Sequence, residues 1–256
     1  MRRLIPTLWP LALMIGGVVV VLDNFLLIEL DLRPYWPALL IVVALSLLLR
    51  GDIVPSAQAQ TFGITRGSVE SGSLEIESGE VDVQVRSLRK PGRLIAGQYT
   101  ARSRPGLAVR NNHATLRMER GRTWWLSMAD WDVGLSNDLP WDLLVSSYLG
   151  RLEVDLGDVQ VGRAYISSGL GHVYLVCPDH AAGTLFARST FGDVRLAVPP
   201  GTQARITVNA GPFARVDADG ARFSETEPGM YVTHPDSEAL DLDITASTVF
   251  GTITLS

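Results

Sequence analysis

The sequence predicts an all-β soluble domain of stacked short strands, preceded by an α-helical transmembrane hairpin. Three observations lead to this prediction. Two apolar runs, each opened by Trp-Pro, lie within the first 50 residues, and a glycine-led strand pattern recurs in the rest of the chain. No stretch after residue 66 has a sustained helical period. The expected organisation is therefore a membrane hairpin over 1–50, a linker over 51–66 and a β-repeat domain over 67–256.

The two apolar runs predict a pair of short membrane helices. Trp9-Pro10 opens the first run and Trp36-Pro37 the second. Proline suits the first helical position, and tryptophan favours the membrane–water interface. Each run spans roughly 22 Å as a helix, against about 30 Å of hydrocarbon, so flanking apolar residues must extend it. A cleaved signal sequence, an interfacial helix pair and a buried soluble hairpin are the alternatives.

Charges around the runs predict the orientation of the hairpin. Arg2 and Arg3 precede the first run, Arg50 follows the second, and the connector between them is net acidic. Because basic flanks stay on the cytoplasmic side, both ends of the hairpin are expected in the cytoplasm. The sequence thus predicts a multi-pass protein of the bacterial cell membrane with a cytoplasm-facing β domain, in contact with the lipid bilayer.

A glycine followed by alternating aliphatic residues defines the repeat of the β domain. It opens at seven of the 24 glycines, more often than composition alone predicts: Gly72, Gly79, Gly150, Gly157, Gly171, Gly192 and Gly251. Several of these glycines are separated by multiples of seven residues. Each unit is expected to be a short strand with one buried face, entered where the chain turns or two backbones come close. Stacked, β-helix-like rungs are the favoured architecture. An antiparallel β-sandwich with glycine turns is the alternative.

The segment from Trp124 to Pro178 resembles the C-terminal domain of LiaF-type cell-envelope stress proteins and related toast-rack domains. Matching positions are Trp131, Leu139-Pro140, Gly150, Leu156, Ser168-Gly169 and Gly171. The N-terminal Trp-Pro repeats likewise resemble the paired helices before such domains. The resemblance implies a toast-rack-type fold and a non-enzymatic regulator that binds a partner, such as a membrane sensor histidine kinase in envelope-stress signalling. It transfers no catalytic residue.

Short motifs that resemble catalytic or cofactor sites lack the surrounding sequence that such sites require. His172, Cys177 and His180 have a spacing that could recruit zinc, but other nitrogen ligands lie far along the chain. Ser167 and Ser168 near Asp179-His180 lack the strand-to-helix turn that exposes a hydrolase nucleophile. Gly169-Leu-Gly171 does not continue into a dinucleotide loop. We therefore expect no enzyme, no cofactor and no metal.

A basic block is the main candidate for a charged surface. Ten Lys and Arg residues lie between 86 and 122 with one acid, Glu119, although the whole chain has a net charge of -5. Its first six members, proposed as a lipid or partner surface, are Arg86, Arg89, Lys90, Arg93, Arg102 and Arg104. Anionic headgroups or an acidic partner could bind them, whereas acidic segments elsewhere in the chain could neutralise them. Nucleic acid is not expected, because the protein is acidic and has no recognition motif.

A tryptophan cluster is the second candidate surface. Its members are Trp124, Trp125, Trp131 and Trp141. Core packing is the default for large aromatics, and partner contact is the alternative. A second function from a different class also stays open: a structural or self-assembling module, or an anionic-lipid-binding one. An exposed final strand near Thr252 would favour a homo-oligomer.

Overall fold

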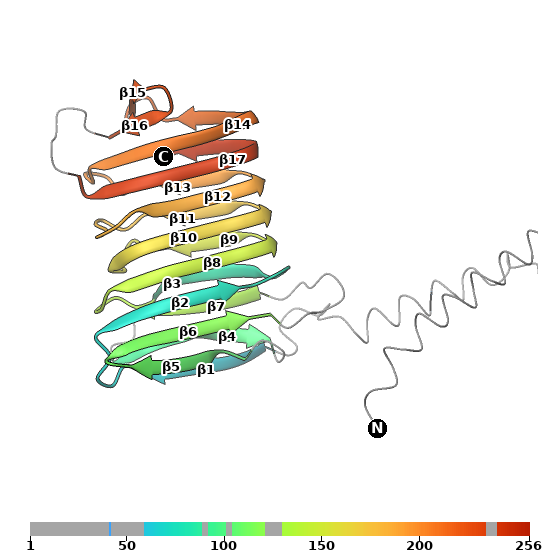
Figure 1. Ribbon diagram of the computed structural model, residues 1–256, viewed down its shortest axis with the longest axis vertical. Coiled ribbons are helices and arrows are strands. Elements are labelled where there is room, and N and C mark those ends of the chain that lie inside the picture. Colours follow the sequence, from blue (N-terminus) through green and yellow to red (C-terminus); the bar gives the residue numbers. More distant parts are fainter. Residues whose placement is uncertain (1–40, 42–58, 89–91, 101–103, 121–129, 234–239) are drawn as a thin grey trace, which may run out of the picture. The chain divides into compact units, whose positions relative to one another are not determined.

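The computed structural model describes Ile41 and residues 59–88, 92–100, 104–120, 130–233 and 240–256. The chain divides into two compact units, 1–50 and 51–256, and the second contains all the strands (Figure 1). Apart from Ile41, the predicted membrane hairpin lies outside the described residues. Among the described residues there is no helix with the length and apolar character needed to span a bilayer.

Seventeen strands form the described part of the second unit. They are β1 (Ala59–Thr65), β2 (Ser71–Glu77), β3 (Asp82–Leu88), β4 (Arg93–Thr100), β5 (Gly106–Arg110), β6 (His113–Glu119), β7 (Asp130–Ser136), β8 (Trp141–Leu149), β9 (Leu152–Asp155), β10 (Val161–Leu170), β11 (Val173–Val176), β12 (Leu185–Phe191), β13 (Val194–Ala197), β14 (Ala204–Ala218), β15 (Ser224–Glu227), β16 (Met230–Val232) and β17 (Leu242–Leu255). No helix occurs among the described residues from 59 onward.

The strands stack as rungs in two layers that face each other (Figure 1). The first layer has the order β5, β6, β2, β8, β10, β12, β17, β14, β16, β15. The second has the order β1, β4, β7, β3, β9, β11, β13, β17, β14. Strands β14 and β17 are long enough to contribute one half to each layer. Pairing is parallel throughout the middle of the stack. It is antiparallel at both ends of the first layer and at the β1 end of the second, whereas the β14 end of the second layer stays parallel. This confirms the prediction of stacked strands over an antiparallel sandwich.

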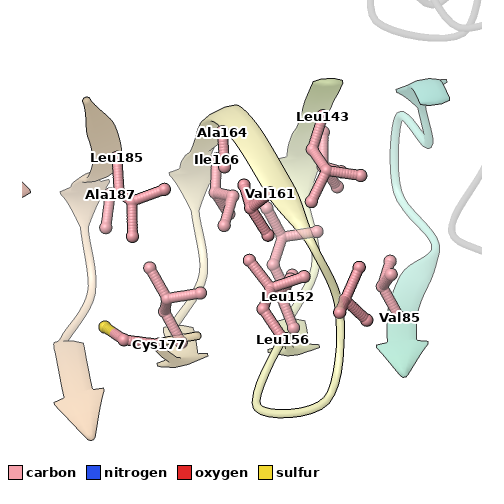
Figure 2. Packing of buried hydrophobic residues seen from close by; sticks show 14 of the residues in the cluster. Val85, Leu143, Leu152, Leu156, Val161, Ala164, Ile166, Cys177, Leu185 and Ala187 are labelled. Atoms are coloured by element: carbon pink, nitrogen blue, oxygen red, sulfur yellow. The ribbon is translucent and has the colours of Figure 1, made fainter. Parts of the chain in front are cut away.

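The core lies between the two layers and follows from the alternation of inward and outward side chains along the strands in the middle of the stack. In β8, for example, Leu143 and Val145 are buried, and the side chain of Leu144 between them faces outward. Figure 2 shows side chains from successive rungs, including Leu143, Ala164 and Leu185, in one continuous apolar interior. Each rung thereby covers the apolar residues of its neighbours, which a single rung cannot do alone.

The turns between layers are fixed by stacked corner glycines. A Cβ on Gly171 would lie 2.0 Å from the carbonyl oxygen of Gly150, and one on Gly192 would lie 2.2 Å from that of Gly171. Successive backbones therefore come too close for any side chain. The prediction that glycine marks such close approaches is confirmed at these corners. Gly157 differs, because Gly157 to Gln160 form a turn before β10 and not the strand expected from the pattern.

Hydroxyl groups reinforce the glycine corners. In four rungs a buried Ser or Thr donates a hydrogen bond to the carbonyl oxygen of the corner glycine in the preceding rung. These pairs are Ser147 with Gly79, Ser168 with Gly150, Ser189 with Gly171 and Thr248 with Gly192. The hydroxyls thus satisfy carbonyl groups at turns where the regular ladder is interrupted.

Removing one of these hydroxyls is expected to destabilise the domain. In Ser189→Ala the Gly171 carbonyl loses a 2.8 Å hydrogen bond in a fully buried setting. We expect the free energy of unfolding to fall by about 1–2 kcal/mol, measured by urea denaturation. Ser167→Ala is the matched control, since no hydrogen bond of the Ser167 hydroxyl occurs among the described residues. Equal losses in the two variants would contradict a role for the corner hydroxyls.

Two expectations about the ends of the domain are corrected. Strand β1 begins at Ala59, inside the segment assigned to a linker, because Phe62 and Ile64 pack against the core from an edge strand. The final strand, β17, is not an exposed edge. It lies between β13 and β14, paired with both, so Thr252 to Leu255 offer no open edge for self-assembly.

Candidate protein-interaction face

The outer surface of the first layer carries a row of exposed apolar side chains. Leu144, Tyr165 and Phe186 occupy outward positions on β8, β10 and β12, and their strands place them directly beside one another. Each is at least 40% exposed although it lies within a strand that is paired on both sides. The rings of Tyr165 and Phe186 are 6.1 Å apart and tilted by 44°. We call these three residues the apolar row.

Charged pairs border the apolar row on the same surface. On one side the Arg163 guanidinium donates to the Asp142 carboxylate at 3.1 Å. At the β2 end of the row, Arg117 donates to Glu75 at 2.8 Å. The hollow over the row, of about 390 Å³, is lined by Arg163, Asp142 and Glu75 together with Ser73 and Thr184. The result is an apolar centre with a polar margin, the arrangement of a protein-binding surface.

An imidazole close to this hollow, that of His113, is held by hydroxyl groups. His113 on β6 lies 2.8 Å from the Ser73 hydroxyl through Nε2 and 2.8 Å from the Ser71 hydroxyl through Nδ1. Both ring nitrogens are thus occupied by serine, and in the described structure no carboxylate makes a hydrogen bond to the ring. A hydrolytic triad requires such an orienting group on the base. The arrangement suits a structural link between β2 and β6.

The basic block is dispersed over several strands. Arg86 lies on β3 and pairs with Asp132 of β7, whereas Arg93 and Arg104 lie exposed at the start of β4 and just before β5. Arg89, Lys90 and Arg102 are outside the described residues. Two arginines of the block are paired with acids, Arg86 with Asp132 and Arg117 with Glu75. Part of the block is thus neutralised by acidic residues from elsewhere in the chain, which was one of the two interpretations of the sequence.

The described tryptophans of the cluster lie in the core. Trp131 and Trp141 are 0% and 1% exposed, so neither ring is accessible to a partner in this structure. Their positions correct the proposed partner surface and agree with core packing, which the sequence also allowed. The physical reason is alternation: both follow a polar residue or turn and occupy inward positions of β7 and β8. Trp124 and Trp125 lie outside the described residues.

The residues of the zinc-like spacing do not converge. Cys177 is buried in the core, and this burial raises the pKa of its thiol to about 12. The side chains of His172 and His180 are exposed, and each lies near a different aspartate. Within the described ranges no three residues of metal-ligating type form a cluster.

Sequence reasoning missed the apolar row, although a signal for it exists. Leu144, Tyr165 and Phe186 follow one another at intervals of 21 residues, as do the corner glycines Gly150 and Gly171. This interval is the length of one rung in the middle of the stack. Aligning the chain at that period would have shown three apolar residues where alternation calls for polar ones.

Comparison with known proteins agrees with this architecture. Residues 56–180 match the family model of the N-terminal domain of toast_rack, DUF2154. The matched stretch contains β1 to β11, and with them two of the three residues of the apolar row. The match and the fold together support a toast-rack-type β domain. No curated protein matches the chain.

One solved structure has the same fold, and two others are more distant. A candidate cell-adhesion protein from Clostridium sporogenes has a TM-score of 0.68 at 15% identity, over 77% of this chain and 97% of its own. Candidate adhesins from Bacteroides fragilis and Parabacteroides merdae have TM-scores of 0.32 and 0.26, at 11% and 12% identity, and cover 79% and 80% of this chain and 99% and 100% of their own. The first of these likenesses is high enough to show a shared fold for the β domain.

Proposed function

We propose that this chain is a non-enzymatic interaction protein of the bacterial cell envelope, anchored in the membrane by residues 1–50. Its toast-rack domain binds another envelope protein through the apolar row. The observation that carries this proposal is the exposure of Leu144, Tyr165 and Phe186 side by side on a rigid sheet. When a partner removes these large apolar groups from water, the free energy of the system falls, which favours binding. The fold shared with a candidate cell-adhesion protein supports the same class of function.

The partner that we propose is a membrane sensor histidine kinase, whose activity the domain modulates in envelope-stress signalling. The resemblance to LiaF-type proteins supports this partner, and the basic flanks of the hairpin support a cytoplasm-facing domain. A rigid stack suits such a role. The apolar row is held at fixed spacing by hydrogen bonds along three neighbouring strands, so it can be recognised without prior ordering.

Site-specific photocrosslinking in intact membranes tests the proposed surface. A photoreactive phenylalanine analogue replaces Tyr165 in the full-length chain, and the same analogue at Tyr174 is the matched control. Both tyrosines are 41% exposed, but Tyr174 lies on the outer face of the second layer. We expect a crosslinked partner from position 165 and at least tenfold less from position 174, with a sensor kinase identified by mass spectrometry.

Two outcomes separate the parts of this proposal. Equal crosslinking from positions 165 and 174, or none from 165, would show that the apolar row is not the binding surface. Capture at 165 of a protein that is not a kinase would contradict the signalling role and retain the interaction surface. As a further check, Tyr165→Ala should reduce capture by an analogue placed at Phe186, which is its neighbour in the row.

A further inference from the structure

The second half of β14 forms an open edge at the C-terminal end of the stack. Residues Phe213 to Ala218 pair with β17 on one side. On the other side, no strand among the described residues pairs with them, because β16 covers only Arg205 to Thr207 in the first half of β14. An edge of this kind presents unpaired N–H and C=O groups that can accept a further strand.

Backbone direction shows which groups face that open side. The Asp219 N–H donates to the Leu255 carbonyl oxygen of β17. Because successive residues of a strand direct their backbone groups to opposite sides, the odd-numbered residues of this segment face β17. The N–H and C=O groups of Ala214, Val216 and Ala218 therefore point to the open edge.

The interior of the stack is incompletely covered at the same place. Val216 is in register with Ile253 of β17, so both side chains point into the core. Ile253 is 0% exposed, whereas Val216 is 37% exposed. Inward-facing residues of the preceding rungs, such as Val173 and Val194, are fully buried. A strand added beyond β14 would complete the cover of Val216.

A column of stacked rings also ends at this edge. Phe191 and Phe250 are stacked 4.6 Å apart, and Phe213 continues the column 4.9 Å from Phe250. Among the described residues Phe213 is the last ring of the column, and it is 67% exposed. An aromatic side chain on an added strand could stack on its outer face in the same geometry.

Two charged side chains on the edge indicate which charges an added strand should carry. Arg215 and Asp217 occupy outward positions, and neither forms an ion pair in the described part of the chain. Their neighbours on β17 are the uncharged Thr252 and Thr254. An added parallel strand gains cross-strand attraction if it places an acid beside Arg215 and a base beside Asp217.

These requirements define a sequence pattern that already exists in this fold. The pattern is an aromatic residue, any residue, an acid, an aliphatic residue and a base, in that order. The same order occurs in Phe191, Gly192, Asp193, Val194 and Arg195. In the structure Phe191 lies on β12 between β10 and β17, and Val194 and Arg195 lie on β13 between β11 and β17. Neither this chain nor a folded second copy can therefore supply this segment to the edge.

We propose that the Phe213–Ala218 edge binds an extended segment of a partner protein that carries this pattern and adds a parallel strand to the stack. Backbone hydrogen bonds supply general affinity for a strand, and the aromatic, aliphatic and charged positions supply selectivity. The site lies on a different strand from the apolar row. It is therefore independent of the function proposed above.

A peptide copy of Ser189–Ala197, labelled with a fluorophore, is the probe for this edge. Its binding to the full-length chain in detergent is followed by fluorescence anisotropy. The matched peptide exchanges the two charges, with Arg in place of Asp193 and Asp in place of Arg195. We expect saturable binding of the first peptide and roughly tenfold weaker binding of the second, since two attractive cross-strand pairs become repulsive.

The doubly exchanged protein, Arg215→Asp with Asp217→Arg, provides the decisive comparison. It should reverse the preference between the two peptides while far-UV circular dichroism stays unchanged, because both side chains are exposed. Equal affinity of both peptides, an unchanged preference in the exchanged protein, or no binding at millimolar peptide would overturn the proposal. Tyr165→Ala should bind the peptide normally, so failure of this site is distinguishable from failure of the apolar row.

Discussion

Trp141→Ala is expected to lower the free energy of unfolding by about 4 kcal/mol. The indole is 1% exposed at the start of β8, and its Nε1 donates to the Ser136 carbonyl oxygen at 2.9 Å. The variant loses the burial of a large ring, leaves a cavity between two rungs and removes that hydrogen bond. Urea denaturation followed by circular dichroism measures the change.

Tyr148→Ala is the matched control on the same strand. The Tyr148 ring is largely exposed at the other end of β8, so its truncation should change the free energy of unfolding by less than about 0.5 kcal/mol. A loss below about 1 kcal/mol in Trp141→Ala would show that the indole does not hold the rungs together.

Gly72 gives an independent test of how Trp141 packs. A Cβ on Gly72 would lie 2.4 Å from the indole ring, so Gly72→Ala should cost about 1–3 kcal/mol in the natural protein. In the Trp141→Ala background that space is vacant, and the same substitution should cost much less. Additive effects of the two changes would contradict direct packing of the ring on Gly72.

Gly171→Ala is the other substitution from which we expect a large effect, a loss of about 3 kcal/mol. Its new Cβ would meet the Gly150 carbonyl oxygen at 2.0 Å and the Gly150 carbonyl carbon at 2.7 Å. Both are backbone atoms of the neighbouring rung, so the rungs must separate and strain the hydrogen bonds on either side. The measurement is again the midpoint and slope of urea unfolding.

Gly157→Ala is the control for this second effect. Its Cβ would meet the Asp155 carboxylate oxygen at 3.4 Å, an ordinary contact with an exposed side chain. We expect a change of less than about 1 kcal/mol. Similar losses at Gly157 and Gly171 would mean that loss of glycine flexibility, and not the approach of two rungs, sets the cost.

The fold class could be predicted because the stacking of rungs imposes a pattern on the sequence of each rung. Alternation along units such as Gly192–Leu196 reflects burial of one face, and a glycine at each corner reflects the approach of the next rung. Both are properties of a single rung that repeat along the chain. The pattern was misleading at Gly157–Val161, because Val159 is buried within a turn and Val161 only begins β10, although the two alternate as they would in one strand.

The candidate site was harder to predict, because the exposure of an apolar residue depends on whether other parts of the folded chain cover it. Tyr165 is a large aromatic residue of the kind usually buried in a core. Its outward position can be predicted only when the 21-residue length of a rung is known. Trp131 and Trp141 show the reverse case, since aromatic residues suited to a partner surface proved to lie in the core.

What the sequence by itself determined was local: short strands, their buried faces, and the glycines at which the chain turns. The order of the rungs was decided by tertiary structure alone. Strand β17 lies between β13 and β14, and β2 lies between β6 and β8, although neither order follows the chain. Parallel rungs of similar length and alternation can pair with many neighbours, so their order depends on contacts between residues far apart in the chain. Those contacts also leave the Phe213–Ala218 edge open and place the apolar row on one surface.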